Sequence, residues 1–535
     1  MLAALVIAVP LAGCGASSSP PLDPASVVPG TAPLYVSAAV QPSGSLKSNT
    51  TASTQKLTHS GEPFSSLLKL LSPSGRQLNY AHDVKPWLGA RAGAFVTSLD
   101  AGKATEALTS SLSEAIASAS IVGAAEGVLQ QLLAGKVSQG AIVLDTTDTG
   151  KANAFLHARA QETGAHAASY RGVSYQVDTG GYAEGLVGKF AVLGSETALH
   201  SVIDTEQAGP ASSILHAAPY AKLTLHAEPG ALANLYLNTS GLPSLGGLLG
   251  NAAQTYLSLL PTPTSFALDI DTISSGGGSE TGLLPGTAAA QFVGQLPGGS
   301  WLALGVGDVS ATFGQGASTL RTFITPLRKL TIGTYSLEGV FAPLFTKSVD
   351  LNKDLLSWMG ATGVFASGSG LLNLQAGVVI ASKDPARSRA AVGKLAQAYR
   401  QAGDEVAPTT IPGAEEAVTV KIAGFPVIVA IGAGNGKFAI GLGPASVQEA
   451  LNPTATLSSS ANYQAAATTL GHGLKPSLLI EFPTLVSLIE TLGLAQSEGI
   501  SSALPYLQSL TTLSGGGGES LGNGVTRARV VLGLQ

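Results

Sequence analysis

The chain has 535 residues, of which 45% are hydrophobic and 11% are charged, and its formal net charge is −5. This composition excludes a disordered or fibrous protein, and the length predicts more than one domain. Because no run of Lys and Arg occurs, nucleic acid is not an expected partner and polybasic adhesion to anionic lipid is not expected either.

The amino terminus carries the pattern of a bacterial lipoprotein signal. A short apolar run is followed directly by Leu11, Ala12, Gly13 and Cys14, which matches the lipobox of Leu, two small residues and Cys. An apolar segment that ends in small residues is typical of a secretory signal peptide. We therefore expect residues 1–13 to be removed as a signal peptide, and we expect the Cys14 thiol to carry diacylglycerol. This cysteine is the only one in the chain.

The lipid would hold the protein at the extracytoplasmic face of the cell membrane. Burial of acyl chains contributes about 0.8 kcal/mol per CH₂, and two chains give stable anchoring. After Cys14 no apolar stretch reaches the roughly 20 residues that a transmembrane helix needs. Residues 14–29 are rich in Ser and Pro and are predicted to be an extended tether. The lipid is therefore the only membrane attachment that the sequence predicts.

Three sequence patterns recur in the same order in the two halves of the remaining chain. Residues 29–36 resemble 297–304, residues 87–96 resemble 358–365, and residues 188–194 resemble 436–441. A recurrence of this kind indicates an internal duplication. We predict a first lobe at residues 30–273, a Gly-rich linker at 274–288 and a second lobe at 289–535. The lobes would meet either across a shared cleft or in a continuous sheet.

The helices with the clearest boundary signals begin at Asp148 and Asp384. Aspartate is a favoured N-cap residue, and Gly164 and Gly403 are placed to end the two helices. The first half also has an extra segment at about residues 101–139. We predict that this insertion forms one or two amphipathic helices rich in small residues.

The other predicted elements mix strands and helices without strict alternation. In chain order they are strands at residues 34–40, 141–144, 173–177, 189–193 and 235–237 with second-half equivalents at 301–306, 376–380, 418–422, 437–440 and 478–480, a helix after Pro63, and helices containing Tyr256 or Tyr506. The strands that follow Gly164 and Gly403 are expected to pair as hairpins. Hairpins combined with helices favour the α+β class. We predict two duplicated lobes, each a mainly antiparallel sheet with helices packed on one face.

Several of these segments together resemble a known family. They are residues 28–36, 84–91, 145–148, 170–175 and 189–194. The chain from Pro24 onward resembles the uncharacterised bacterial family called domain of unknown function 3352, found mainly in high-GC Gram-positive bacteria. The resemblance implies a cell-envelope setting and a bilobed body. It implies no reaction, ligand or site residue.

Two glycine-rich stretches match functional motifs by letter only. Residues 518–522 fit G-x-S-x-G, but a nucleophile elbow needs a strand before Ser520 and a helix after it. A glycine run precedes this serine and a strand is predicted after it. Residues 432–437 are one position short of a Walker motif and lack its Ser or Thr. We interpret the first stretch as a flexible hairpin loop and the second as a turn into a strand, so no catalytic residue is predicted.

No metal or cofactor site is predicted either. The eight histidines lack metal-ligand spacing, and structural zinc sites usually need cysteine ligands. Asp269 and Asp271 alternate with apolar residues, which places both on one face of a strand. A cation site and a solvated face are both compatible with this pattern, and we favour the solvated face. Trp87 and Trp358, paired by the duplication, are interpreted as core aromatics rather than the floor of a ligand cleft.

These observations predict a non-catalytic binding or scaffolding module of the cell envelope. The expected partners are the membrane, through lipid on Cys14, and an apolar ligand or an envelope protein. One alternative is a carrier or sensor of lipid or another apolar ligand, which the low charge content and the insertion at residues 101–139 favour. Another is an envelope hydrolase, which only the location supports.

Overall fold

The structure is a computed structural model, and it describes most of the chain from residue 22 onward. The predicted tether of residues 14–29 is wrong at its end, because Pro24–Val27 form the short helix η2, whose Ala25 and Val27 are buried in the core. The described residues are 22–58, 78–98, 139–240, 252–274, 286–310, 331–332, 335–336, 339, 349–370, 373–497 and 500–535. The signal peptide, the lipobox with Cys14, the helix predicted after Pro63, the insertion and most of the linker lie outside them. Within the described residues no helix is long and apolar enough to cross a membrane.

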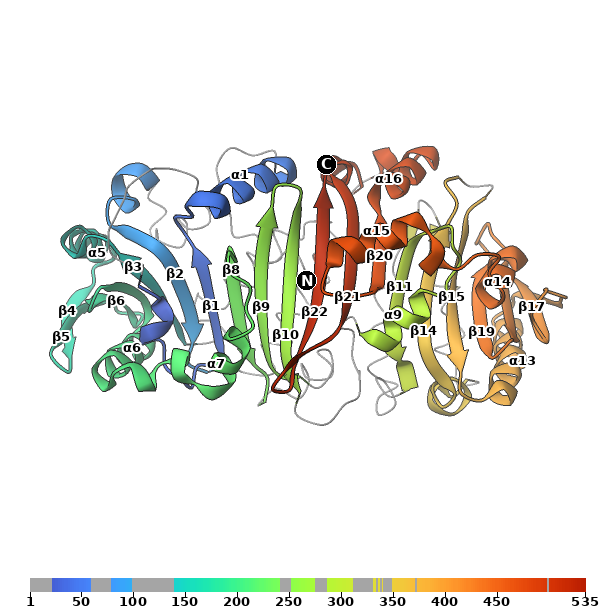
Figure 1. Cartoon of the computed structure of the whole chain (residues 1–535), viewed down its shortest axis with the longest axis horizontal. Coiled ribbons are helices and arrows are strands. Elements are labelled where there is room, and N and C mark those ends of the chain that lie inside the picture. Colours follow the sequence, from blue (N-terminus) through green and yellow to red (C-terminus); the bar gives the residue numbers. More distant parts are fainter. Residues whose placement is uncertain are drawn as a thin grey trace.

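Twenty strands in the described part of the chain form one antiparallel sheet along the elongated molecule (Figure 1). From one edge to the middle the order is β4 (His166–Tyr170), β5 (Val173–Val177), β6 (Tyr182–Val187), β7 (Phe190–Ser195), β3 (Gly140–Thr146), β2 (Leu88–Val96), β1 (Leu34–Ala39), β8 (Ala233–Asn238), β9 (Ala252–Thr262) and β10 (Ser265–Ser274). From the middle to the other edge it is β22 (Val525–Leu534), β21 (Leu510–Gly522), β20 (Pro476–Glu481), β11 (Ser300–Asp308), β14 (Met359–Ser367), β15 (Gln375–Ser382), β19 (Lys437–Leu442), β18 (Val429–Gly434), β17 (Glu416–Lys421) and β16 (Glu405–Pro408). A separate pair contains β12 (Thr331–Ile332) and β13 (Tyr335–Ser336).

The two halves are joined in one sheet and do not form two separate sheets. Strands β10 and β22 are paired over nearly their whole length, from Ser265 opposite Gly533 to Ile273 opposite Val525. Of the two arrangements that the sequence left open, the structure has the continuous sheet. The ten strands on either side of this junction follow the same order, counted outward from the middle.

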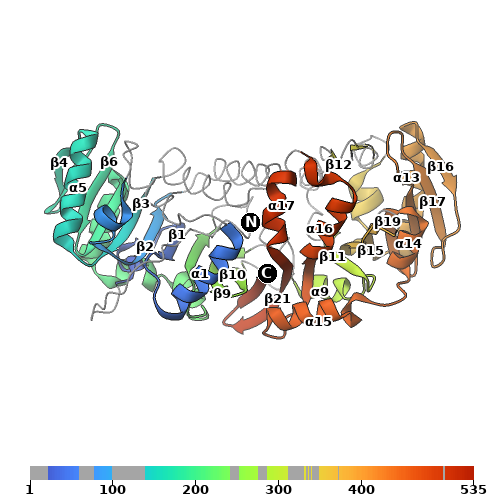
Figure 2. The ribbon, with the colours of Figure 1, turned by 90° about the horizontal axis from the view of Figure 1, so that it is seen from above.

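The described helices lie on both sides of this sheet. They are η2 (Pro24–Val27), α1 (Gly44–Thr58), η3 (Tyr80–Val84), α5 (Thr149–Thr163), α6 (Glu196–Ala208), η4 (Pro210–Ser212), η5 (Ile214–His216), α7 (Ala218–Thr224), α9 (Thr287–Val293), η7 (Leu351–Leu356), α13 (Pro385–Gln401), α14 (Gly443–Leu451), η8 (Leu457–Ser459), α15 (Ala461–Leu470), α16 (Phe482–Thr491), η9 (Leu494–Gln496) and α17 (Ile500–Gln508). Figure 2 shows α16 and α17 on one side of the sheet, with α9 and α15 on the other.

The prediction that helices cover only one face is therefore wrong. Helix α5 packs with Ile142 and Leu144 of β3, whereas α6 packs with Ala141 and Val143 of the same strand. Successive residues of a strand point to opposite faces, so the two helices cover opposite faces. In the second half α13 and α14 are divided in the same way between neighbouring residues of β15. Strands β3 and β15 therefore each have a helix packed on both faces.

Two local predictions fail because the sheet has strands that the sequence pattern did not indicate. Strands β5 and β7 do not form a hairpin, since β6 lies between them, and β18 lies in the same way between β17 and β19. Tyr256 lies in strand β9 and not in a helix. Its apolar neighbours Leu259 and Leu260 fit helical spacing, but a strand with both faces covered gives the same pattern.

The glycine run before Ser520 is part of strand β21 and not a flexible loop. Gly515, Gly516 and Gly517 are buried within this strand. A Cβ atom at Gly516 would lie 2.6 Å from the carbonyl oxygen of Lys475. Glycine therefore allows β21 to approach the segment before β20 more closely than another residue would.

The predicted helix boundaries and core tryptophans are confirmed. Asp148 accepts a hydrogen bond from the Lys151 N–H, and Asp384 caps α13 in the same way. Gly164 ends α5 in the left-handed conformation that favours glycine. Trp87 and Trp358 are 1% and 0% exposed.

Candidate functional site

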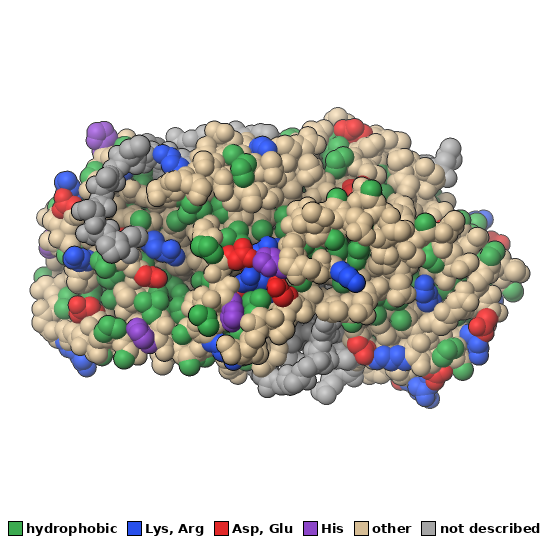
Figure 3. All heavy atoms as spheres, in the orientation of Figure 1, with side chains coloured by type: hydrophobic (Ala, Val, Ile, Leu, Met, Phe, Trp, Pro, Cys, Tyr) green, Lys and Arg blue, Asp and Glu red, His purple; other side chains and the backbone are tan. Residues whose placement is uncertain are grey.

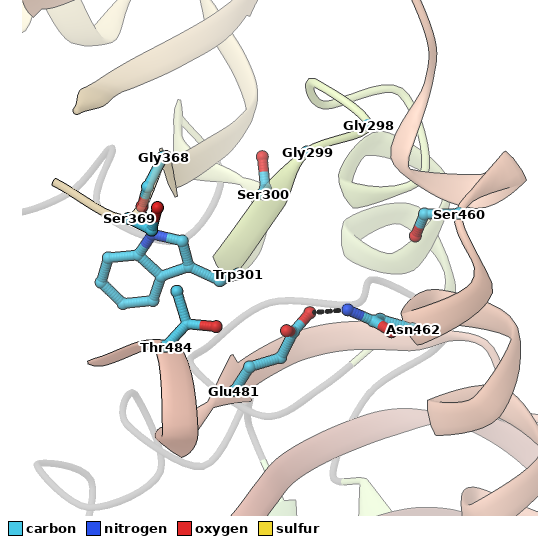
Figure 4. A pocket seen from close by; sticks show the side chains of 10 residues that line it. All are labelled: Gly298, Gly299, Ser300, Trp301, Gly368, Ser369, Ser460, Asn462, Glu481 and Thr484. Carbon is cyan, nitrogen blue, oxygen red and sulfur yellow. Dashed lines mark hydrogen bonds between the residues drawn. The ribbon is translucent and has the colours of Figure 1, made fainter. Parts of the chain in front are cut away.

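A shallow pocket of about 250 Å³ opens at one end of strands β11, β14 and β20 (Figure 4). Residues of four segments line it, and they are Gly298, Gly299, Ser300, Trp301, Gly368, Ser369, Ser460, Asn462, Glu481 and Thr484. The strands are antiparallel, so the start of β11 and the ends of β14 and β20 meet at this edge. The pocket belongs to the second half of the chain.

Trp301 fixes one wall of the pocket. Its side chain is almost fully buried, with the residue 6% exposed, and its Nε1–H donates to the carbonyl oxygen of Gly368 at 2.8 Å. Buried indole N–H groups need such a partner. The Ser300 hydroxyl donates to the carbonyl oxygen of Pro297 at 2.6 Å. These bonds hold the segments before β11 and after β14 in place on either side of the opening.

Glu481 is the titratable group of this pocket. It ends β20 directly before α16, and its carboxylate accepts a hydrogen bond from the side-chain amide of Asn462 (Figure 4). Burial raises the pKa of Glu481, although the hydrogen bond from Asn462 acts in the opposite direction. A half-buried carboxylate of this kind favours a ligand that donates hydrogen bonds. The other lining side chains provide no second acid, base or cation, so the pocket lacks the paired groups of general acid–base catalysis.

A second cluster of charged side chains lies at the junction of the two halves, near the middle of the face shown in Figure 3. Asp269 and Asp271 extend from β10 toward Arg527 and Arg529 of β22. The two aspartates lie on the same face of β10, as the sequence predicted. The favoured solvated face is wrong, because both carboxylates are 1% exposed. The alternation indicated the shared face, but it could not indicate that arginines about 260 residues away cover it.

Each aspartate is bound by one arginine through two hydrogen bonds. Arg527 donates to Asp271 at 2.7 and 2.8 Å, and Arg529 binds Asp269 through Nε and Nη2, the latter at 2.8 Å. Burial lowers the pKa of each arginine, but the hydrogen bonds and charges of the carboxylates outweigh burial and raise it. Both guanidinium groups therefore stay charged. Bidentate pairs of this type are geometrically specific.

Residues that follow α7 and α15 complete the rim of this cluster. Glu228 accepts hydrogen bonds from Arg529 at 2.7 Å and from Arg527 at 3.3 Å. His472 approaches the same Glu228 oxygen at 2.9 Å through Nε2. In the described chain no group of three or more His, Cys, Asp or Glu side chains could hold a metal ion. The cation alternative for Asp269 and Asp271 does not hold, because guanidinium groups occupy their oxygens.

The sequence pattern did not indicate the residues that shape the pocket or those that complete the charged cluster at the junction. Trp301, Asn462 and Glu481 are far apart in the chain and form no local motif. Arg527 and Arg529 could have been noticed, because they alternate with apolar residues in the last strand as the two aspartates do in theirs. Cys14, Leu11, Ala12 and Gly13 lie outside the described residues.

Comparison with known proteins identifies a family. The model of the family described as "Protein of unknown function (DUF3352)" matches residues 1–532. No curated protein matches the chain. Among solved structures, it is similar to "Structure of crystal form III of TP0453", with 9% identity, a TM-score of 0.27, and coverage of 48% of this chain and 82% of that chain. For "Structure of crystal form I of TP0453" the identity is 8%, the TM-score 0.26 and the coverage 48% and 81%. TM-scores this low do not establish a shared fold. The family model, in contrast, matches residues 1–532, and the chain belongs to the DUF3352 family.

Proposed function

We propose that this protein is a lipid-anchored module of the cell envelope that binds or scaffolds other envelope components without catalysis. The observation that carries the proposal is the lipobox at Leu11, Ala12, Gly13 and Cys14, followed by a tether and a folded body. Two acyl chains on Cys14 would hold the body at the extracytoplasmic face of the membrane. A continuous sheet suits a scaffold, because strands joined by hydrogen bonds keep distant surface sites at fixed spacing.

We also infer that the two halves arose by internal duplication. Support comes from the equal strand order and from matched details. Trp87 donates its Nε1–H to the carbonyl oxygen of Asp83 at 2.8 Å, four residues earlier, and Trp358 donates to that of Asp354 at 2.7 Å. The same hydrogen bond from a buried tryptophan in both halves, together with equivalent helix caps, favours a common origin.

The chemistry of the pocket supports binding rather than catalysis. Glu481 stands among Ser, Thr, Asn and Gly with no other titratable lining residue. A compact ligand with hydroxyl or amine donors would give this carboxylate a second hydrogen-bond partner. The pocket is therefore the place where we expect a small polar component of the envelope to bind.

Substitution of the lipobox cysteine tests the anchor directly. Cys14→Ala should abolish incorporation of labelled fatty acid and should release the protein from membranes or block its maturation. Ser17→Ala, in the same tether, is the matched control and should remain lipid-labelled and membrane-bound. Membrane fractionation together with intact-mass analysis gives the answer. A Cys14→Ala protein that still incorporates labelled fatty acid, or a wild-type protein whose intact mass shows an uncleaved chain with an unmodified Cys14 thiol, would refute the lipoprotein assignment.

A second candidate is a carrier or sensor of lipid or another apolar ligand. The observation that favours it is the high hydrophobic content, 45%, beside only 11% charged residues. Native mass spectrometry of protein purified from membranes distinguishes the two functions. A carrier should retain acyl molecules beyond those on Cys14, whereas a scaffold should show the mass of the anchored chain alone.

A further inference from the structure

Strands β10 and β22 occupy matching places in the two halves and pair with each other. The β9–β10 hairpin runs from Thr262 to Ser265, and the β21–β22 hairpin runs from Gly522 to Val525. Both turns contain two residues, so Ser265 and Val525 are equivalent. Counting onward from these residues makes Asp269 equivalent to Arg529.

Asp269 and Arg529 are also direct cross-strand partners. An approximate twofold axis through the sheet therefore passes between them. At such a position two identical strands would place the same residue against itself. In this chain the position carries opposite charges, and Asp271 and Arg527 continue the complementarity on the same face.

Pairing of like halves in this register would bring like charges together. Two copies of β10 would set Asp269 against Asp269, and two copies of β22 would set Arg529 against Arg529. The native side chains of these residues are 1% and 10% exposed, so little water would screen the repulsion. Buried charges without an opposite partner are strongly unfavourable.

We propose that Asp269, Asp271, Arg527 and Arg529 make the β10–β22 junction selective for unlike halves. The first half accepts the second half and rejects another first half. A second copy of this chain can then associate through the junction only by exchanging halves with the first copy. This proposal concerns the fold and does not depend on the anchor at Cys14.

The opposite face of the same two strands explains why selectivity, and not stability, is assigned to the charges. Leu268, Ile270, Ala528 and Val530 form an apolar cluster there. Apolar burial drives strand association without discriminating between partners. Buried ion pairs contribute little net stability compared with apolar packing, and their best-supported role is to specify register and partner. The apolar face of the junction therefore drives strand association, and the charged face determines which strand is the partner.

Charge reversal in the full-length chain tests the selectivity. All variants are made in a Glu228→Gln background, because Glu228 accepts hydrogen bonds from both arginines and would repel carboxylates at their positions. D269R/D271R makes the junction positive, and R527D/R529D makes it negative. The quadruple variant D269R/D271R/R527D/R529D exchanges the signs of the charges. After refolding from denaturant, light scattering coupled to size exclusion measures the monomer yield. Either double variant should give a monomer yield about tenfold or more below that of the background. The quadruple variant should restore the monomer yield.

An apolar variant separates selectivity from stability. D269L/D271L/R527L/R529L should unfold cooperatively at a denaturant concentration close to that of the background, but it should refold to dimers and larger species as the protein concentration increases. The proposal is overturned if this variant refolds to monomer as completely as the background. The proposal is equally overturned if the quadruple charge-exchange variant gives no more monomer than the double variants. This comparison can be made even if the leucine variant does not fold.

Discussion

The two halves of the sheet bury different side chains at matching positions beneath helices α5 and α13. In the first half Arg159 of α5 forms an ion pair with Glu184 of β6, and their side chains are 5% and 3% exposed. Arg159 lies as far from the Asp148 cap as Leu395 does from the Asp384 cap. Glu184 lies opposite Leu193 just as Ile431 of β18 lies opposite Ile440. The second half therefore places Leu395 and Ile431, both buried, where the first half has two opposite charges.

The strand order therefore does not depend on whether charged or apolar side chains fill the space between helix and sheet. Removing a carboxylate and a guanidinium from water costs several kcal/mol per ion, and their attraction has to offset that cost. Leucine and isoleucine incur no such cost. Both pairs are compatible with the fold, because Arg159 has the opposite charge of Glu184 beside it and Leu395 has apolar Ile431.

The largest effect is expected from breaking the ion pair on one side only. Arg159→Leu should lower the free energy of unfolding by about 3–5 kcal/mol, because it leaves the Glu184 carboxylate buried without a cation. The double variant R159L/E184I, which installs the residues of the second half, should be within about 1 kcal/mol of the wild type or more stable. Equilibrium urea unfolding measures both. If the double variant is as unstable as Arg159→Leu, the halves are not interchangeable at this position.

The contrast between the halves also shows how far the sequence could predict the fold. Helices α5 and α13 were predicted because their boundaries are local: Asp148 and Asp384 cap the starts, and glycines follow the ends. The α+β class followed from the same kind of local signal. Strand β18, Val429–Gly434, was missed because its apolar residues and two glycines show no alternation when both faces of a strand are buried.

The candidate site was less predictable than the fold because its contacts are not local. The spacing of Asp269 and Asp271 indicated one shared face, and the structure has it. Their burial depends on Arg527 and Arg529, which lie about 260 residues later in the chain, in its last strand. Glu481 gave no signal at all, since its pocket exists only where three strand ends and α15 meet.

A smaller, equal effect is expected for the two matched tryptophans. Trp→Phe at position 87 or 358 keeps most of the apolar packing but removes the indole N–H, which leaves the carbonyl oxygen of Asp83 or Asp354 without that donor. An unsatisfied buried acceptor costs about 1–3 kcal/mol, and because these two bonds are part-buried, the loss should lie toward the lower end of that range. Thermal unfolding followed by circular dichroism should show similar losses for Trp87→Phe and Trp358→Phe. Markedly unequal losses would mean that the two sites are not energetically equivalent.

The smallest effect is expected at the two helix caps. Asp384→Ala should lower the stability of the fold by about 1 kcal/mol, because the first N–H groups of α13 lose their acceptor. Asp148→Ala should act in the same direction on α5. Asparagine caps nearly as well as aspartate, so Asp148→Asn and Asp384→Asn are the matched controls and should lose less than the alanine variants.

The cap at Asp148 should also give stability a dependence on pH. The backbone N–H of Lys151 and then its side chain donate hydrogen bonds that hold the pKa of Asp148 below its usual value of 3.8. A carboxyl group with a lowered pKa in the folded state stabilises the fold above its unfolded pKa and loses that contribution as the pH falls through the folded pKa. The difference in melting temperature between wild type and Asp148→Ala should therefore narrow on acidification below about pH 4. Asp148→Asn keeps the cap without the charge, so its difference from Asp148→Ala should not follow the same titration. A gap between wild type and Asp148→Ala that stays constant down to acid unfolding would show that the cap contributes through hydrogen bonding alone.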